Sequence, residues 1–306
     1  MSDKIKARIC AIVYGIFLVA FTAYVLLDTF VIERVYRKVD EEENTFYAVD
    51  NDESYDENET TESIITENSY KDDHVSIEIT EYYELNTMIY VADVRIDDIR
   101  YLKTAFARNT YGKNITKKTS EIAKDNEAIL AINGDFYGAH SDGYVIRNGV
   151  LYRELKDSYN QEDLVIYKDG TFGIIKEGEY TAKELLNNDA LQVFSFGPGL
   201  VDDGEIIVGR EDEVAVAMEN NPRTAIGIID ELHYVFIVSD GRTKESVGLS
   251  LYELADFMKK LGVKTGYNLD GGGSATMYFN GKVINNPTTD GNTFKERSVS
   301  DIVFIG

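Results

Sequence analysis

Residues Tyr267–Met277 read Tyr-Asn-Leu-Asp-Gly-Gly-Gly-Ser-Ala-Thr-Met, and the rest of the chain is organised around this stretch. A short apolar run reaches Asp270, and three glycines follow it directly. Consecutive glycines lose much conformational entropy on folding, so a folded chain keeps them where a side chain would clash or where the backbone bends sharply. One interpretation is a tight turn between two strands. The other is a nest of backbone N–H groups beside a carboxylate and a hydroxyl, which suits an anionic or sugar substrate.

On either side of this stretch, the sequence pattern predicts many short strands and a few helices. Residues 75–83 alternate between apolar and polar side chains, as a half-buried strand does. Two capping boxes, Thr181–Glu184 and Ser250–Glu253, predict helices, and the second helix should end at Leu261 with Gly262 as its C′ residue. Asn-Gly or Asp-Gly pairs predict hairpins at three places: 148–149, 169–170 and 280–281. The pattern predicts an α+β fold with one mixed, mainly antiparallel sheet domain.

The N-terminal region contains a candidate membrane anchor. Ile9–Leu27 is nineteen residues without a charge, close to the roughly 20 residues that cross a bilayer. A cleaved signal peptide and a buried core helix are the alternatives. We expect a cytoplasmic tail over residues 1–8, a single transmembrane anchor over 9–30 and an extracytoplasmic C-terminal domain in the cell membrane.

The net charge of −23 is unevenly distributed. Residues 40–74 hold fourteen acidic residues against one basic residue, which predicts an acidic, flexible linker over 31–74 and a folded domain over 75–306. No basic cluster typical of a nucleic-acid partner is present. The single cysteine, Cys10, lies inside the expected anchor, so no intrachain disulfide can form.

Four polar clusters follow predicted strands, and strand ends on one sheet edge can converge on a pocket. The clusters are Asn133 with Asp135; Arg223; Asp240 with Arg242; and Asp270 with the glycines and Ser274. Each has a structural alternative: a carboxylate that binds turn amides, an ordinary turn or a surface ion pair. Together they predict a single site for an anionic or sugar substrate.

The order of the polar motifs resembles that of the phosphodiester glycosidase family. The motifs are Asn-Gly-Asp-Phe-Tyr, Asn-Pro-Arg-Thr-Ala, Ser-Asp-Gly-Arg, Gly-Leu-Ser-Leu-x-Glu-Leu-Ala-x-Phe-Met and Asn-Leu-Asp-Gly-Gly-Gly-Ser-Ala-Thr-Met. The resemblance covers roughly Ala128–Gly306. It implies hydrolysis of a sugar-1-phosphodiester at the glycosidic bond, with an N-acetylglucosamine-type or cell-envelope glycan as substrate. Bacterial proteins similar to this family are labelled exopolysaccharide biosynthesis proteins.

The resemblance also suggests site residues. These are Asn133, Arg223, Asp240, Arg242, Asp270, Gly271, Gly272, Gly273 and Ser274. Asp135 is added on chemical grounds alone, since the family often has a small residue there. We expect Asp270 to attack the sugar or activate water, with Asp135 and Asp240 as further catalytic candidates. Arginine binds phosphate with a planar fork, so Arg223, Arg242 and the glycine amides should hold the phosphate.

Three alternatives remain open at this point. A metal-dependent phosphodiester hydrolase would use Asp135, Asp240 and Asp270 as oxygen ligands for a hard divalent cation. Only three histidines exist in the chain, which argues against zinc. A non-catalytic carbohydrate-binding or assembly protein would bind glycans without turnover, and a structural ectodomain would do neither. The main expectation involves no cofactor.

Overall fold

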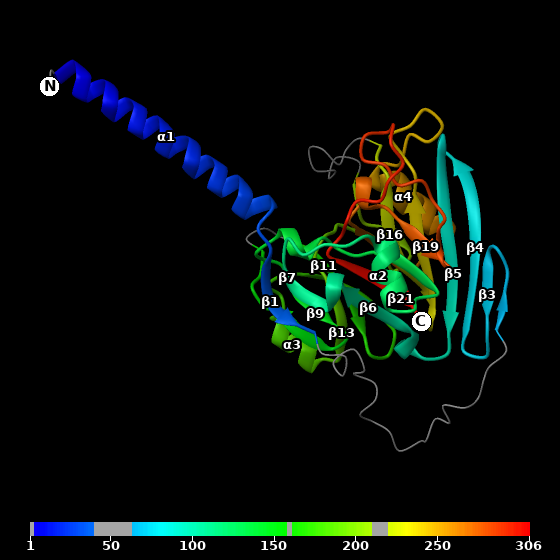
Figure 1. Ribbon diagram of the computed structural model, residues 1–306. Coiled ribbons are helices and arrows are strands. Elements are labelled where there is room, and N and C mark those ends of the chain that lie inside the picture. The colour runs from blue at the N-terminus through cyan, green and yellow to red at the C-terminus, as the bar shows by residue number, and fades with distance from the viewer. Residues whose placement is uncertain (1–2, 40–62, 158–160, 210–219) are drawn as a thin grey trace.

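The structure, a computed structural model, describes residues 3–39, 63–157, 161–209 and 220–306. A long helix, α1 (Asp3–Phe30), projects from a domain of mainly antiparallel sheets with few helices (Figure 1). The predicted α+β class is confirmed. Three short helices belong to the domain: α2 (Thr119–Asp125), α3 (Ala182–Asn187) and α4 (Leu251–Lys260).

The largest sheet has nine strands in the order β15-β14-β18-β16-β17-β5-β4-β3-β2. Its strands are β2 (Ile64–Ile65), β3 (Ser69–Lys71), β4 (Val75–Glu84), β5 (Thr87–Ile96), β14 (Gly199–Asp202), β15 (Glu205–Ile206), β16 (Arg223–Asp230), β17 (His233–Ser239) and β18 (Thr265–Leu269). Strand β16 pairs antiparallel with both β17 and β18, so the residues that follow β17 and β18 lie at the same sheet edge as the start of β16.

Two five-stranded sheets and one two-stranded sheet complete the domain. The first five-stranded sheet contains β10 (Val150–Arg153), β9 (Val145–Arg147), β13 (Ala190–Phe194), β11 (Glu162–Tyr167) and β12 (Phe172–Lys176). The second contains β20 (Lys282–Val283), β19 (Met277–Phe279), β8 (Leu130–Asn133), β21 (Asp301–Ile305) and β6 (Leu102–Phe106). The two-stranded sheet pairs β1 (Arg34–Lys38) with β7 (Thr110–Lys113).

Alternation along the strands explains how the layers pack. In β17, Tyr234 and Phe236 enter the core shared with the five-stranded sheets, whereas Val235 and Ile237 pack on the face that α4 covers. Both faces of this strand are therefore buried, as its uninterrupted apolar sequence requires. Helix α2 covers the outer face of the β8 sheet, and α3 packs against the β9–β13–β11 sheet.

The local predictions are largely confirmed. All three Asn-Gly or Asp-Gly pairs connect antiparallel neighbours, namely β9–β10, β11–β12 and β19–β20. Both capping boxes are present, at Thr181 before α3 and at Ser250 before α4. Gly262 follows α4 with φ +84°, the left-handed conformation that glycine adopts without steric cost.

The N-terminal segment differs from its expected organisation. Helix α1 is long and apolar enough to cross a membrane, with a mean hydropathy of 2.4, and a signal sequence has the same features. The linker expected over 31–74 contains strands at both ends, because β1 pairs with β7 and β2–β3 join the nine-stranded sheet. The remainder of that expected linker, residues 40–62, lies outside the described residues.

Candidate active site

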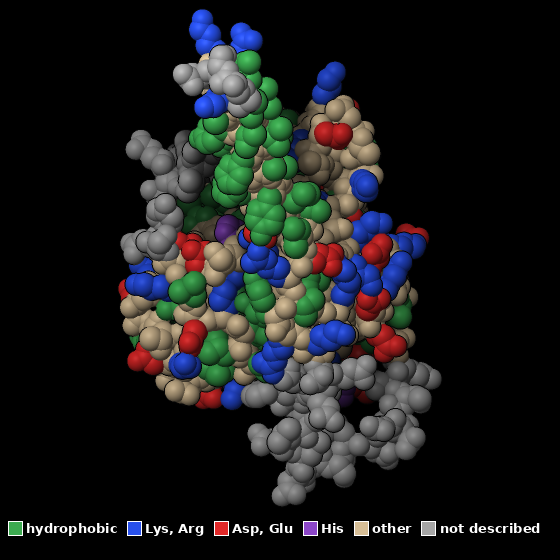
Figure 2. All heavy atoms as spheres, turned by 60° about the vertical axis from the view of Figure 1, so that its left-hand side comes forward, with side chains coloured by type: hydrophobic (Ala, Val, Ile, Leu, Met, Phe, Trp, Pro, Cys, Tyr) green, Lys and Arg blue, Asp and Glu red, His purple; other side chains and the backbone are tan. Residues whose placement is uncertain are grey.

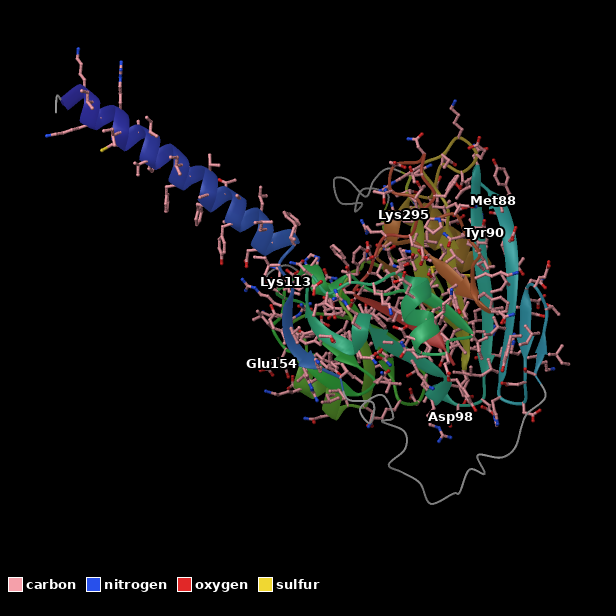
Figure 3. The ribbon with its side chains drawn as sticks, viewed as in Figure 1. Met88, Tyr90, Asp98, Lys113, Glu154 and Lys295 are labelled. Carbon is pink, nitrogen blue, oxygen red and sulfur yellow. The ribbon has the colours of Figure 1, made fainter. Side chains whose placement is uncertain are left out.

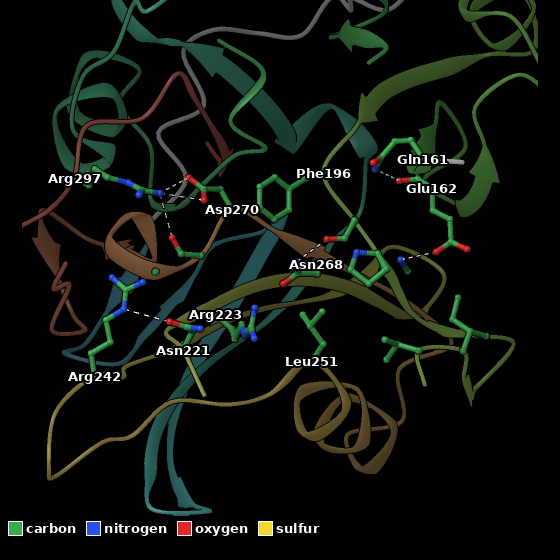
Figure 4. Close-up of a pocket in the computed structure, with 17 residues that line it drawn as sticks. Gln161, Glu162, Phe196, Asn221, Arg223, Arg242, Leu251, Asn268, Asp270 and Arg297 are labelled. Carbon is green, nitrogen blue, oxygen red and sulfur yellow. Dashed lines mark hydrogen bonds and ion pairs between the residues drawn. The ribbon is translucent and has the colours of Figure 1, made fainter. Parts of the chain in front are cut away.

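Asp270 lies immediately after β18, at the edge of the nine-stranded sheet where β16 begins. Its side chain is 9% exposed and lines a pocket of about 640 Å³ (Figure 4). Arg223, Arg242 and Arg297 line the same pocket. The lining has three guanidinium groups against two carboxylates, Asp270 and Glu162, which favours an anionic ligand although the chain as a whole carries a charge of −23.

Arg297 holds the Asp270 carboxylate. Its Nη2 donates to both carboxylate oxygens, at 3.1 Å and 2.9 Å, and its Nε donates to the Ser274 hydroxyl at 2.7 Å. Burial raises the pKa of Asp270, and this effect outweighs Arg297, the Ser274 hydroxyl and the Gly271 amide, which all lower it. The carboxylate is thus fixed in orientation and poised to exchange a proton nearer neutral pH than an exposed aspartate.

The three glycines permit close packing beneath this carboxylate. A Cβ at Gly271 would lie 2.7 Å from the carbonyl oxygen of Pro222, so no larger residue fits there. Gly272 has φ +59° and donates its N–H to the same carbonyl at 2.8 Å. A Cβ at Gly273 would lie 2.2 Å from the Thr289 hydroxyl. The run forms the turn η5 (Gly272–Ser274), which fits the turn interpretation of the sequence.

This geometry corrects the expected role of the glycine amides. The Gly272 amide is bonded to Pro222, and the Gly271 amide interacts with the Asp270 carboxylate. Both residues also line the pocket. Ser274, also expected to contact substrate, instead bonds Arg297 and lowers the pKa of Asp270. The glycine run thus supports the carboxylate, and a contact of its first two residues with a ligand stays a prediction.

The predicted phosphate-binding arginines both reach the pocket. Arg223 is the first residue of β16 and donates from Nε to the Leu249 carbonyl at 2.8 Å. Arg242 donates from Nε to Asn221 at 3.2 Å and from Nη1 to the Thr289 carbonyl at 2.7 Å. These bonds orient both guanidinium groups, which reduces the entropy lost when a ligand binds.

Asn133 lies beneath the site rather than in it. It is fully buried, and its Nδ2 donates to the backbone carbonyl of Asp270 at 2.5 Å. Its Oδ1 accepts from the Thr224 hydroxyl at 2.8 Å and from the Thr276 amide at 3.2 Å. Asn133 therefore ties β8 to β16 and β18, and we correct its expected substrate contact to a positioning role.

Asp135 and Asp240 are both outside the pocket. Asp135 is fully buried and pairs with Arg147 at 2.9 Å, which also binds Asp301 at 2.8 Å. Asp240 accepts from the amide of Asn286 at 2.8 Å and from its side chain at 3.0 Å. Neither carboxylate lines the pocket, because each is bound in a separate cluster, so this structure does not bring them together with Asp270 as the sequence predicted.

The same separation bears on the metal-dependent alternative. Asp135, Asp240 and Asp270 do not share a site, since their carboxylates bind Arg147, Asn286 and Arg297 respectively. Among residues 3–39, 63–157, 161–209 and 220–306, no three His, Cys, Asp or Glu side chains are grouped as a metal centre requires. The donor set proposed from the sequence is therefore not assembled in this arrangement.

The sequence pattern of the family described as phosphodiester glycosidase matches residues 126–306, more than half of the chain. The chain belongs to the phosphodiester glycosidase family. All the pocket-lining residues fall within this matched region.

Several proteins are similar to this chain in sequence. The chain is 30% identical over 199 residues to the SPbeta prophage-derived uncharacterized protein YomE of Bacillus subtilis (strain 168), covering 64% of this chain and 30% of that protein. It is 30% identical over 185 residues to human N-acetylglucosamine-1-phosphodiester alpha-N-acetylglucosaminidase, covering 55% and 35%. The mouse protein of the same name is 28% identical over 176 residues, covering 52% and 33%. The chain thus spans about a third of the length of these relatives.

Solved structures show the same fold. The catalytic domain of zebrafish N-acetylglucosamine-1-phosphodiester alpha-N-acetylglucosaminidase superposes with a TM-score of 0.60 at 22% identity, covering 76% of this chain and 82% of that one. A hypothetical protein from Synechocystis gives 0.59 at 16% identity, covering 76% and 62%. The glycosidase domain of this chain therefore has the architecture of the family.

The sequence analysis missed several residues of this pocket. Arg297 lies in a polar loop without periodicity, 27 residues after Asp270, so no local signal in the sequence joins the two. Phe196, Glu162 and Asn268 also line the pocket. Asn268 lay inside the quoted motif, but the direction of its side chain depends on the tertiary structure.

Proposed function

We propose that this chain is a membrane-anchored, extracytoplasmic glycosidase that hydrolyses the sugar–phosphate bond of a sugar-1-phosphodiester. The observation that carries the proposal is the Asp270 carboxylate, held by Arg297 in a pocket that Arg223 and Arg242 also line. Membership of the phosphodiester glycosidase family supports the same reaction. The names of the mammalian relatives point to an N-acetylglucosamine-type sugar.

The arginines suit the leaving group of this reaction. When the bond between the sugar carbon and the bridging oxygen breaks, a phosphate monoester anion departs and needs little protonation. A second carboxylic acid, which ordinary glycosidases use to protonate an alcohol, is then dispensable. Arg223 and Arg242 would stabilise the charge that develops on the departing phosphate.

Asp270 would supply the other half of the reaction. It either attacks the anomeric carbon or removes a proton from an attacking water molecule. Retention of the anomeric configuration in the first product would assign it as a nucleophile, and inversion as a base. Arg297 and the Asn133 clamp would keep the carboxylate aimed at the sugar, since small displacements of a catalytic group cost much rate.

The opposite side of the pocket is suited to a sugar ring. In Figure 4, Gln161 and Glu162 lie across the pocket from Arg297 and Arg242, with Phe196 between them. The Glu162 carboxylate accepts the Gly199 amide at 3.0 Å, which fixes its direction. Asn268 is 3% exposed, and within the described part of the chain its Oδ1 accepts no hydrogen bond. We assign this side to sugar hydroxyls and the aromatic ring to an apolar sugar face.

The experiment that tests the proposal uses the full chain in detergent with a methyl N-acetylglucosamine-1-phosphodiester, and NMR follows the free sugar. We expect release by the native protein and at least a ~10³-fold loss in Asp270→Asn. Asp203→Asn is the matched control, because Asp203 occupies an exposed turn with φ +48° that asparagine also tolerates. Full activity of a folded Asp270→Asn protein would refute the assignment. Loss of activity on chelation would favour the metal-dependent alternative, and glycan binding without release the binding-protein alternative.

A further inference from the structure

The segment that follows α1 is part of the folded domain. Helix α1 ends at Phe30, and after three residues the chain enters β1. Strand β1 pairs antiparallel with β7, with Arg34 opposite Lys113 and Lys38 opposite Thr110. Residues 40–62 then connect β1 to β2 of a different sheet, so they link two parts of one domain rather than the domain to the helix.

Side chains of the domain also bind the end of the helix itself. The Asn114 side chain donates to the carbonyls of Thr29 and Ile32, at 3.1 Å and 3.0 Å. Arg108 forms a bidentate pair with Glu33, at 3.2 Å and 2.7 Å. The junction is therefore held by side chains from the domain in addition to the strand pairing.

The short connection between α1 and β1 limits how far the domain can lie from the end of the helix. Three extended residues span at most ~11 Å, whereas a flexible linker over residues 31–74 would have a root-mean-square length of ~35 Å. Lys4–Phe30 forms a helix about 40 Å long, enough for the hydrocarbon core and part of the headgroup layers. A domain joined so closely to such a helix has little room to leave the surface.

The exposed residues at the junction match a lipid headgroup layer. Strand β1 is exposed along its whole length, and it combines the basic Arg34, Arg37 and Lys38 with Val35 and Tyr36, each 58% exposed. Figure 2 shows the exposed hydrophobic side chains of α1 and the Lys and Arg side chains on the domain surface around its end. Tyrosine favours the membrane interface beside a membrane helix, and long basic side chains reach the lipid phosphates there.

We propose that the face around β1 and Lys113 docks on the lipid bilayer, so that the catalytic domain lies against the membrane instead of moving on a long tether. This inference rests on the membrane anchor proposed above and is independent of the reaction. Its consequence for the substrate is a sugar-1-phosphodiester located at the membrane surface. Lys113 lies beside the end of α1, whereas Asp98 lies on the far side of the domain (Figure 3).

Energy transfer from a single tryptophan tests the docking, since the chain contains no tryptophan. The full chain is placed in vesicles of mixed anionic and neutral lipid with a dansyl acceptor on the headgroups. Lys113→Trp should transfer strongly. Arg95→Trp is the matched control, because it also removes one cation but lies near Asp98 at the end of β5, and it should transfer weakly. Equal, weak transfer from both positions would overturn the proposal.

Two further variants test the insertion of α1 and the pairing of β1 with β7 separately. Phe21→Trp reports insertion of α1 and should be quenched by brominated acyl chains. An unquenched Phe21→Trp signal would overturn the anchor and the docking together. A Cβ at Gly112 would lie 2.1 Å from the Arg34 carbonyl oxygen, so Gly112→Ala should detach β1 from β7. In the Lys113→Trp protein this change should reduce transfer to the Arg95→Trp level, while hydrolysis of a soluble diester by the Gly112→Ala protein remains.

Discussion

Replacing Arg297 by glutamine should shift the pH dependence of catalysis. Arg297 contacts both oxygens of Asp270 and lowers the pKa of this buried carboxyl. Without the guanidinium charge, nothing from Arg297 offsets the effect of burial, so the pKa of Asp270 rises further. A carboxylate that must be ionised to act is then protonated up to a higher pH, so the acid limb of kcat/KM should move upward in pH.

The size of the shift follows from the geometry. Two unit charges about 4 Å apart interact by ~4 kcal/mol at an effective dielectric constant of 20, which corresponds to roughly 3 pKa units. The Arg297 side chain is 41% exposed, however, so solvent screens much of this attraction. We therefore expect the acid limb to move by ~1–2 pH units.

The assay is a profile of kcat/KM against pH for diester hydrolysis by the native protein, Arg297→Gln and Arg297→Lys. Lysine retains the positive charge but lacks the planar fork, so its acid limb should lie closer to that of the native protein. The reasoning is refuted if Arg297→Gln lowers the rate at every pH and leaves the acid limb in place. Arg297 would then act on the substrate rather than on Asp270.

Three further outcomes follow from the packing around the site. Asn133→Ala should lower kcat by ~10²-fold with little change in KM, because Asn133 positions Asp270 without lining the pocket; a rise in KM alone would contradict this. Gly271→Ala should destabilise the protein by ~1–3 kcal/mol in urea unfolding, since its Cβ meets the fixed Pro222 backbone, whereas Gly273→Ala should cost less because the Thr289 side chain it meets is exposed. Burial, with Asp135 nearby, raises the pKa of Asp301 from 3.8 to about 7 against the effect of Arg147. Between pH 3.8 and about 7 the Asp301 carboxyl is protonated in the folded state and ionised in the unfolded state, so the free energy of unfolding should fall as pH rises through this range. A Tm at pH 8 equal to that at pH 5 would contradict the raised pKa, and so would an unchanged pH dependence of Tm in Asp301→Asn.

Local signals in the sequence predicted local structure well. Asn-Gly and Asp-Gly pairs specify their own hairpins, and the capping boxes at Thr181 and Ser250 specify helix starts, because the interactions involved span only a few residues. Asp270, Arg223 and Arg242 were also found, since each follows or begins a strand at one edge of the nine-stranded sheet.

The wrong expectations depend on tertiary contacts. Asn133 ends β8 and Asp135 follows it, in the five-stranded sheet that contains β21, so their polar atoms bind Asp270 and Arg147 beneath the site. The sequence of a single strand does not show which sheet the strand joins. Likewise, Arg34–Lys38 is a strand only because β7 lies beside it, and its charged composition hid this pairing.

The proposed reaction breaks the bond between the sugar carbon and the bridging oxygen, so the nucleophile attacks carbon and not phosphorus. The most direct measurement is hydrolysis of a sugar-1-phosphodiester by the full chain in ¹⁸O-labelled water, with mass spectrometry of the phosphate monoester produced. A glycosidase breaks the bond between the sugar carbon and the bridging oxygen, so the phosphate product should contain no ¹⁸O. Incorporation of ¹⁸O into the phosphate would contradict the account, because it would show attack at phosphorus.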